Sequence, residues 1–330
     1  MNHPEDDAYC TPMRFDGNYK NVRAARYSIV GWYDLFTVQN LKNFVEMTKP
    51  SIPAAVRAKQ KIIVGPWGHG TWGGTKLGAL DFGKDAVLNT QELTLRWFDA
   101  TLKGVDNGIM KEPPLKIFVM GANVWRYENE WPLKRTVYTK YYLHSAGGAN
   151  TKDGDGTLGT DAQKSEPADR FTYDPDSPVP SMPDSSVFDD FRNYPIDYSG
   201  LEGRPDILVY STPALERDTE VTGPIEIVLY AASSAKNTDF TGRLLDVYPD
   251  GRAIAIRDGI IRASFRSGPR NTSNIEPGKV YKYSIDLGPT SNVFLKGHRI
   301  RVEISSSNFP RFDRNLNTGG NFATETTWVK

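Results

Sequence analysis

The stretches that decide the fold are Ile29–Phe36, with the sequence IVGWYDLF, and Lys61–Gly70, with the sequence KIIVGPWGHG. Each is a short apolar, β-branched run that ends in a glycine-containing turn, and each turn presents one polar side chain. Buried parallel strands of open α/β sheets have this pattern and deliver their chemistry at their carboxyl ends. The first strand delivers Asp34 and the second delivers His69. We therefore predict that an acid and a histidine meet at one edge of a parallel sheet.

Helical and strand patterns alternate through the first 134 residues. Phe36 to Met47 has apolar residues at a roughly helical spacing and is followed by Pro50. Asp85 to Lys103 has the clearest helical pattern and stops at a glycine. Leu115 to Met120 is a further apolar run that predicts a strand. Strand, helix and strand in succession indicate a βα unit of a parallel sheet.

The helical period disappears from about Arg135 onward, and short β-type runs alternate with Gly, Pro, Asn and Asp. Several short strands at this spacing favour an antiparallel sandwich or jelly roll. We expect strands at Tyr138–Leu143, Ile207–Tyr210, Ile225–Ala231, Leu244–Tyr248, Ala253–Ile256, Gly259–Phe265, Lys279–Ile285 and Arg299–Ser305. The fold class is therefore α/β plus all-β.

Composition excludes several classes of function. The chain has 330 residues, which suggests two domains, with 40 Lys+Arg against 40 Asp+Glu. This balance gives no electrostatic reason to expect nucleic acid or an acidic membrane surface as a partner. The single cysteine, Cys10, allows neither an intrachain disulfide nor a cysteine-based metal site. No apolar run approaches the roughly 18 residues of a membrane span, and the sequence does not decide between cytoplasm and export.

Four histidines are present, and they differ in their surroundings. His3 lies in a polar leader, where we expect it to be solvated. His144 and His298 adjoin strands, where a hydrogen-bonded structural role is favoured. His69 is flanked by glycines at a strand end, which makes it the candidate for a catalytic role. Asp34 alone would fit an Asx turn, but an acid followed by a histidine is the order of the Ser…Asp…His triad in α/β hydrolases.

No serine fits the Gly-x-Ser-x-Gly pattern of a nucleophile elbow. Ser145 has Gly147 after it but Leu143 where the first glycine should be, and Ser199 has Asp197 two residues before it. The nucleophile of an α/β hydrolase is therefore expected to be absent from these residues. No cluster of His, Asp or Glu has the spacing of metal ligands, so neither a metal nor another cofactor is predicted.

Gly31–Asp34 and Gly65–His69 resemble the acid and histidine motifs of the CocE/NonD hydrolases. This family includes cocaine-esterase-like enzymes and is related to X-prolyl dipeptidyl-peptidases of the peptidase S15 type and to α-amino-acid ester hydrolases. Further segments that are similar to the family are Leu95–Asp99, Leu102–Gly104, Phe118–Gly121, Trp131–Pro132, Asp246–Gly251, Pro277–Gly278, Gly297–Arg301 and Ile304–Arg311. The resemblance covers nearly the whole chain.

The resemblance implies an α/β-hydrolase domain with a helical cap, followed by a jelly-roll domain of the X-Pro dipeptidyl-peptidase C-terminal type. Residues 1–134 are then the C-terminal portion of the catalytic domain, with 1–25 a remnant of the cap region, and residues 135–330 are the jelly roll. Asp34 and His69 match the triad acid and general base, and Phe36 matches an aromatic wall of the acyl pocket. The flanking Trp32 and Trp67 are further candidates for substrate binding.

In this family the serine and an oxyanion-hole tyrosine lie well upstream of the acid, and only 33 residues precede Asp34 here. We therefore expect the C-terminal portion of such an enzyme, nearly inactive by itself. The related α-amino-acid ester hydrolases have acidic residues two and three positions after the triad acid. Phe36 and Thr37 stand there, so the resemblance favours a neutral ester or amide acyl group over a cationic one.

Two classes of function follow from these observations. The first is a serine acyl hydrolase for a small-molecule ester, an amide or a peptide, whose serine comes from a missing half or another chain. The second is a non-catalytic jelly-roll module for glycan or peptide binding or for assembly, with Trp125, Trp131 and Tyr173 as candidate contact residues. We expect no nucleic acid or membrane partner, and a homo-oligomer stays open.

Overall fold

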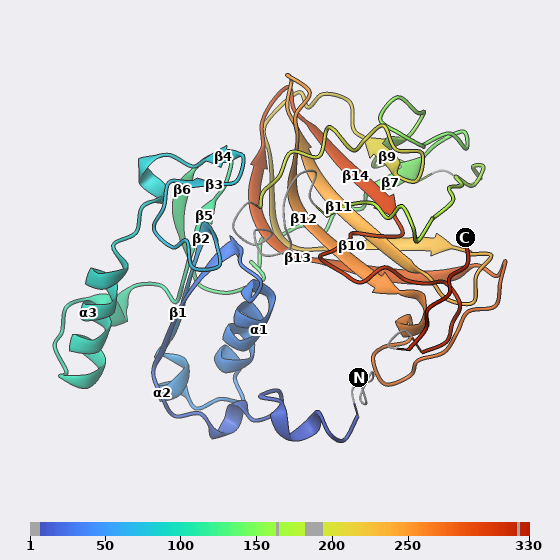
Figure 1. Ribbon diagram of the computed structural model, residues 1–330. Coiled ribbons are helices and arrows are strands. Elements are labelled where there is room, and N and C mark those ends of the chain that lie inside the picture. Colours follow the sequence, from blue (N-terminus) through green and yellow to red (C-terminus); the bar gives the residue numbers. More distant parts are fainter. Residues whose placement is uncertain (1–6, 163–164, 182–193, 322–323) are drawn as a thin grey trace.

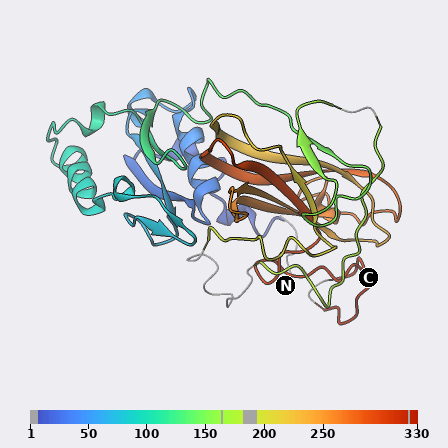
Figure 2. The same ribbon diagram turned by 90° about the horizontal axis from the view of Figure 1, so that it is seen from above.

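The protein was examined as a computed structural model, which describes residues 7–162, 165–181, 194–321 and 324–330. An α/β part and a β-rich part lie side by side in it (Figure 1). Seen from above, they occupy opposite ends of an elongated molecule (Figure 2). The two fold types expected from the sequence are therefore both present, in the expected order along the chain. His3 lies outside the described residues.

The α/β part is built on one four-stranded sheet with the order β1-β2-β5-β6. β1 pairs with β2 and β2 with β5 in parallel, while β6 is antiparallel to β5. The strands are β1 (Arg26–Tyr33), β2 (Gln60–Gly68), β5 (Leu115–Val119) and β6 (Val124–Glu128). The three parallel strands, β1, β2 and β5, lie where the sequence predicted strands. β6 was not among the predicted strands.

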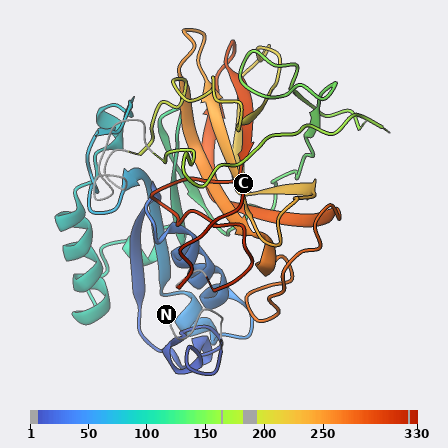
Figure 3. The ribbon, with the colours of Figure 1, turned by 45° about the vertical axis from the view of Figure 1, so that its right-hand side comes forward.

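Helices lie on both sides of this sheet, α1 on one and α3 on the other (Figures 1 and 3). The helices are α1 (Thr37–Thr48), α2 (Ala54–Arg57) and α3 (Thr90–Leu102). α1 buries Leu41 and Phe44 in the core beneath the sheet, as its apolar spacing predicts. α3 begins later than the expected Asp85, because the Asn89 side chain accepts a hydrogen bond from the Glu92 N–H and caps the helix there.

The β-rich part is a sandwich of two sheets. One has the order β12-β11-β14-β9-β8-β7, and the other is the long antiparallel pair β10-β13. These strands are β7 (Tyr142–His144), β8 (Thr157–Gly159), β9 (Leu208–Ser211), β10 (Thr219–Ala231), β11 (Asp239–Val247), β12 (Ala253–Arg262), β13 (Tyr281–Phe294) and β14 (Arg299–Ser305). Side chains from the two sheets, such as Tyr283 of β13 and Phe240 of β11, meet in a common core. The sandwich is thus present, and the finer jelly-roll description stays a prediction.

Two strand predictions need correction. The runs Ala253–Ile256 and Gly259–Phe265 are one strand, β12, which ends at Arg262 and continues into a 3-10 turn at Ala263–Phe265. Gly259 interrupted the β pattern because its backbone passes close to the Asp286 carbonyl, where a Cβ would lie 2.2 Å from the oxygen. β8 was not among the predicted strands, since a strand of three residues is too short to show a pattern in the sequence.

The two parts share one hydrophobic core. Leu245, Val247 and Val293 of the sandwich belong to the same buried cluster as Val30 and Phe118 of the α/β part. Backbone hydrogen bonds join the parts as well, because the Met120 N–H donates to the Ser291 carbonyl at 3.0 Å and the Val293 N–H donates to the Met120 carbonyl at 2.8 Å. The sandwich therefore supports the sheet directly.

Gly121 makes this close junction possible. Its φ of 79° lies in the left-handed region, and a Cβ at this position would lie 2.1 Å from the Val293 carbonyl oxygen.

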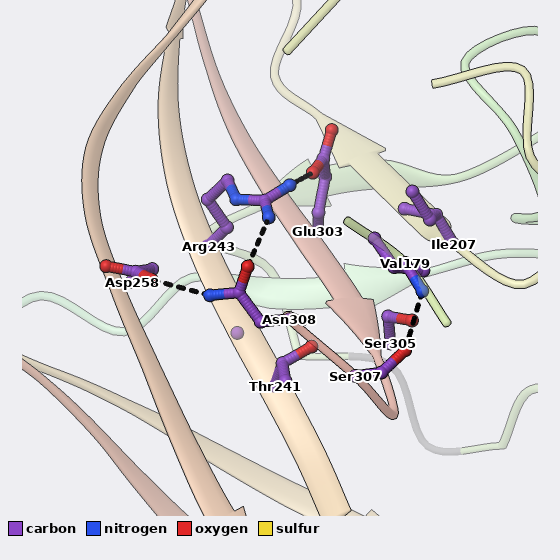
Figure 4. Close-up of a pocket in the computed structure, with 10 residues that line it drawn as sticks. Val179, Ile207, Thr241, Arg243, Asp258, Glu303, Ser305, Ser307 and Asn308 are labelled. Atoms are coloured by element: carbon purple, nitrogen blue, oxygen red, sulfur yellow. Dashed lines mark hydrogen bonds and ion pairs between the residues drawn. The ribbon is translucent and has the colours of Figure 1, made fainter. Parts of the chain in front are cut away.

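A network of charged side chains is buried on the outer face of the six-stranded sheet, where Val179 and Ile207 also line it (Figure 4). Arg243 Nη1 lies 2.7 Å from Glu303 Oε2, and Asn308 lies between Arg243 and Asp258. The enclosed cavity among these side chains is about 10 Å³, which is room for one water molecule at most. Arg243 Nε and Glu303 Oε1 have no hydrogen-bond partner among the described residues.

Glu202 lies at the far end of the same network and forms a buried ion pair with Arg301. Burial together with the neighbouring Glu303 carboxylate raises the pKa of Glu202 to about 7. A proton on Glu202 would give Glu303 Oε1 the donor that it lacks.

No helix within the described part of the chain combines the length and hydrophobicity needed to cross a membrane.

Candidate active site

Asp34 and His69 meet at the carboxyl ends of β1 and β2. His69 Nδ1 lies 3.2 Å from Asp34 Oδ2, which is a hydrogen bond between the two side chains. The β1–β2 register places Val30 opposite Val64 and Tyr33 opposite Gly68, so the residues that follow the two strands come side by side. The structure thus brings together the acid and the histidine that the sequence pattern singled out.

Local hydrogen bonds hold Asp34 in place. Its second carboxylate oxygen, Oδ1, accepts the Phe36 N–H at 2.8 Å, which is an Asx turn. The Thr37 hydroxyl is shared between the Asp34 carbonyl, at 2.6 Å, and the Gly31 carbonyl. The turn and the pairing with His69 therefore occur together, because each uses a different carboxylate oxygen.

Gly31 lets the two strands approach at this end. A Cβ on Gly31 would lie 1.9 Å from the Trp67 carbonyl oxygen, so a residue with a side chain would push β1 and β2 apart. The glycines that mark the ends of the two apolar runs therefore have a steric role in placing the acid beside the histidine.

The side chains of Asp34 and His69 differ in their exposure to solvent. The Asp34 side chain is 2% exposed, whereas the His69 side chain is 46% exposed. A buried carboxylate on Nδ1 fixes the imidazole tautomer with the proton on Nδ1 and leaves Nε2 with its lone pair. Nε2 has no hydrogen-bond partner among the described residues, so it is available to a group that arrives from solvent or from another chain.

Two exposed aromatic rings flank His69. The Phe36 ring lies 5.3 Å from the imidazole with the planes at 76°, and the Trp72 ring lies 6.4 Å away at 84°. Both aromatic side chains are about half exposed. Phe36 was predicted to line the site. Trp72 was not, because it stands in a glycine-rich loop without a strand or helix pattern, and only its closeness to His69 in the sequence could have indicated it.

Trp32 and Trp67 are buried, 0% and 1% exposed, and their placement does not support the predicted contact with substrate. Trp32 Nε1 donates to the Phe118 carbonyl at 2.7 Å, and Trp67 Nε1 donates to the Gly74 carbonyl at 3.3 Å. Successive strand residues point to opposite faces, so an indole one or two residues before the strand end can enter the core instead of the site. Both residues act as core supports for the strand ends.

Arg257 of the sandwich ties the site to the second part of the chain. Its Nη1 donates to the Trp32 carbonyl at 2.6 Å and its Nε donates to the Leu287 carbonyl at 2.9 Å. Burial lowers the pKa of Arg257, although the group stays protonated because arginine titrates so far above neutrality. Sequence reasoning missed this residue, since nothing local to β12 relates it to a strand more than 200 residues earlier.

Two other histidines also pair with carboxylates, but in closed surroundings. His298 Nδ1 lies 2.8 Å from Asp246 Oδ1, both side chains are buried, and the imidazole stacks on Tyr248 at 4.3 Å. Burial raises the pKa of Asp246 to about 6. His144 pairs with Glu166 at 2.9 Å and is 15% exposed. His69 therefore differs from both by combining a buried acid with a half-exposed imidazole.

No serine hydroxyl within the described residues forms a hydrogen bond with His69. The Ser145 hydroxyl donates to Asp169 at 2.6 Å on the sandwich, far along the chain from His69. Ser199 lies in a turn where its N–H donates to Asp197. The part of the chain that the structure describes therefore presents an acid and a base without a serine bonded to the base.

The residues considered for a non-catalytic binding face are separated in the structure. Trp131 packs on Trp32 in the core, and Trp125 packs beside Trp67 and donates to the Asp85 carbonyl. Tyr173 is also buried, and its hydroxyl donates to the Asn315 carbonyl at 3.0 Å. Their positions explain them as packing residues. Within the described residues, no group of three or more His, Cys, Asp or Glu side chains is placed to hold a metal ion.

The chain is similar to known proteins over most of its length. Residues 107–328 match the model of the X-Pro dipeptidyl-peptidase C-terminal non-catalytic domain, and residues 1–71 match that of the X-Pro dipeptidyl-peptidase S15 family. The chain is 41% identical over 328 residues to cocaine esterase from Rhodococcus sp. (strain MB1 Bresler), covering 98% of this chain and 56% of the esterase. The chain thus spans about half the length of the curated relatives it matches.

Solved structures show the same fold. An aminopeptidase from the marine sediment archaeon Thaumarchaeota archaeon superposes with a TM-score of 0.82 at 24% identity, covering 96% of this chain and 53% of the aminopeptidase. An α-amino-acid ester hydrolase superposes with a TM-score of 0.81 at 24% identity, covering 96% of this chain and 54% of the hydrolase.

Proposed function

Because this chain belongs to the family of serine hydrolases that includes cocaine esterase and the X-Pro dipeptidyl-peptidases, we propose that Asp34 and His69 are the acid and the general base of a catalytic triad. The reaction is transfer of an acyl group from an ester, amide or peptide bond to a serine and then to water. The observation that supports this most is the Nδ1–Oδ2 hydrogen bond at the ends of two parallel strands.

The proposed chemistry follows from the orientation of the imidazole. Nε2 of His69 takes the serine proton while the serine oxygen attacks the carbonyl carbon of the substrate, and Asp34 stabilises the imidazolium that results. The imidazolium then gives this proton to the departing alcohol or amine as the acyl-enzyme forms. In the second half-reaction Nε2 takes a proton from water, whose oxygen attacks the acyl carbon, and the proton returns to the serine.

We propose that the serine comes from outside these 330 residues, either from a preceding part of the same polypeptide or from a second chain. Two features of the α/β part favour this. Within the described residues no strand pairs with the outer edge of β1, which is the first strand in the sheet order. On α3 the side chains of Leu95, Phe98 and Leu102 are 61%, 49% and 77% exposed at helical spacing. An open edge and an apolar stripe are surfaces that a further half-sheet would cover.

The preferred substrate has a neutral acyl group. Phe36 is half exposed beside His69 and offers an apolar wall, while the Thr37 hydroxyl is buried and occupied by two backbone carbonyl groups. Neither residue offers a carboxylate to a substrate ammonium group. Ester and amide substrates without a charged amino group therefore suit this part of the site better.

A complementation assay tests the proposal. The full chain would be co-expressed with the serine-bearing N-terminal half of a cocaine-esterase-like relative, and hydrolysis of a p-nitrophenyl ester would be measured. We expect activity only in the complex, reduced at least about 10³-fold in kcat by Asp34→Asn or His69→Gln. The matched control is His144→Gln, which also removes a histidine from a carboxylate pair and should leave kcat unchanged. Equal losses from His69→Gln and His144→Gln would refute the assignment.

A further inference from the structure

A second cavity lies at one end of β11 and β12, in a region that the proposed hydrolase chemistry does not use. Its volume is about 370 Å³, within the range of sites that bind small molecules. Four segments form its walls: the turn before β11, the end of β12 with Ala263–Phe265, the loop at 272–274 and the C-terminal residues 315–321 with Glu325. A cavity assembled from segments far apart in the sequence keeps its shape only while the sandwich is folded.

Two polar groups in the cavity wall lack hydrogen-bond partners within the described part of the chain. Ser264 is 8% exposed, lines the cavity, and its hydroxyl makes no hydrogen bond among the described residues. Asn237 uses its side-chain oxygen to accept the N–H groups of Thr238 and Ser264, both at 3.1 Å. The amide NH₂ of Asn237 has no such partner in the described residues, so a donor and a hydroxyl border the same space.

Other polar side chains of the wall are held firmly. The Asn274 NH₂ donates to the Gly319 carbonyl at 2.8 Å, and the Thr318 hydroxyl donates to Glu325 Oε2. The first contact joins the 272–274 loop to the C-terminal segment, and the second lies within that segment. The polar wall is thus partly pre-organised, which lowers the entropy cost of binding a ligand.

The charge of the cavity wall favours a neutral ligand. Arg262 and Glu325 are its two charged side chains, so the formal charges cancel. The Arg262 guanidinium is also engaged with buried Asp239, with Nε 2.9 Å from Oδ1 and Nη2 3.3 Å from Oδ2. A phosphate would therefore meet no excess of positive charge here.

We propose that this cavity binds a neutral, hydroxyl-rich small molecule of the mono- or disaccharide class. Hydroxyl groups both donate and accept hydrogen bonds, as the unpartnered Ser264 hydroxyl and Asn237 amide require, and Phe265 offers an apolar surface to the C–H face of a sugar ring. Peptides are recognised chiefly through open strand edges, apolar grooves or captured chain ends, whereas most side chains of this wall are amides and hydroxyls. The site is separate from Asp34 and His69.

Saturation-transfer NMR and calorimetry on the full chain test this. The probes are D-glucose, D-galactose, maltose and lactose, with the dipeptide Gly-Pro and inorganic phosphate for comparison. We expect at least one saccharide to bind with a dissociation constant on the order of 1 mM, and neither comparison ligand to compete. Asn237→Asp keeps the acceptor for the two N–H groups but removes the donor, and Ser264→Ala removes the hydroxyl. Each should weaken binding at least about fivefold.

Two controls keep the outcome interpretable. Ser267→Ala changes a serine outside the cavity wall and should bind like the wild type, and so should Asp34→Asn, because this site does not depend on the proposed triad. Circular dichroism establishes whether each variant is folded. If Ser264→Ala does not fold, the binding measured for Asn237→Asp decides the test. Absence of saccharide binding at about 10 mM, ten times that constant, would overturn the proposal. Binding that survives both wall variants, or preferential binding of Gly-Pro or phosphate, would do so as well.

Discussion

Replacement of Glu202 by Gln should stabilise the protein at alkaline pH and leave it little changed at acidic pH. Glu202 is buried beside Glu303, and its pKa is raised from an ordinary 4.5 to about 7. The folded state therefore binds more protons than the unfolded state between these two pH values. Between about pH 4.5 and pH 7 the free energy of unfolding therefore falls as the pH rises. The cost of ionising Glu202 in the folded protein reaches its full value above this window.

The size of the effect follows from the pKa difference. A difference of about 2.5 between folded and unfolded states corresponds to at most about 3 kcal/mol, at about 1.4 kcal/mol for each pKa unit. Gln keeps an oxygen for the hydrogen bond from Arg301, and its NH₂ supplies Glu303 Oε1 with the donor that it lacks. The variant therefore retains both contacts at every pH.

Urea unfolding followed by tryptophan fluorescence at several pH values between about 5 and 8 measures this difference. Other carboxyl groups with shifted pKa values, Asp246 among them, titrate in both proteins and cancel when the two curves are subtracted. Glu226→Gln, on the exposed surface of β10, is the matched control and should follow the wild type. The reasoning is refuted if Glu202→Gln and wild type stay parallel over the whole pH range.

Three further substitutions test the packing that places the site. Trp32→Ala should lower the free energy of unfolding by about 3–5 kcal/mol, because it removes a fully buried indole; a loss below about 1 kcal/mol in urea unfolding would contradict its core role. Arg257→Met should lower the free energy of unfolding by about 1–3 kcal/mol, because the Trp32 carbonyl loses its hydrogen-bond donor. Hydrogen exchange at β1 should become faster, and unchanged exchange there would contradict a stabilising role for this hydrogen bond. Gly121→Ala should cost about 2 kcal/mol or more, since its backbone is left-handed and the Val293 carbonyl occupies the Cβ position; an unchanged melting temperature would show that the junction can relax.

Strong local patterns made much of the α/β part predictable. Apolar runs that end in glycine identified β1 and β2, and the helical spacing of Leu41 and Phe44 identified α1. The closeness of Asp34 to His69 followed from parallel pairing, since adjacent parallel strands end at the same edge. The sandwich was predictable as a class, because many short strands of this spacing form few other folds.

Long-range packing accounts for what the sequence could not predict. Trp32 and Trp67 stand next to the site residues in the chain, but their indoles enter the core, and only the three-dimensional pairing decides which face a strand-end residue takes. Arg257 reaches the site from the other part of the chain, and no periodicity relates it to β1. The raised pKa of Glu202 likewise depends on burial and on its charged neighbours Arg301 and Glu303 of β14, which are distant from it in the chain.

Labelling with a fluorophosphonate probe tests most directly the claim that Asp34 and His69 serve a serine outside these 330 residues. The probe would be applied to the purified chain and to its complex with a serine-bearing half, and intact mass and peptide mapping would locate any adduct. We predict no adduct on the chain alone, and in the complex an adduct on the serine of the added half that is slowed at least about 10³-fold by His69→Gln. A stoichiometric, His69-dependent adduct on a serine of this chain would contradict the account.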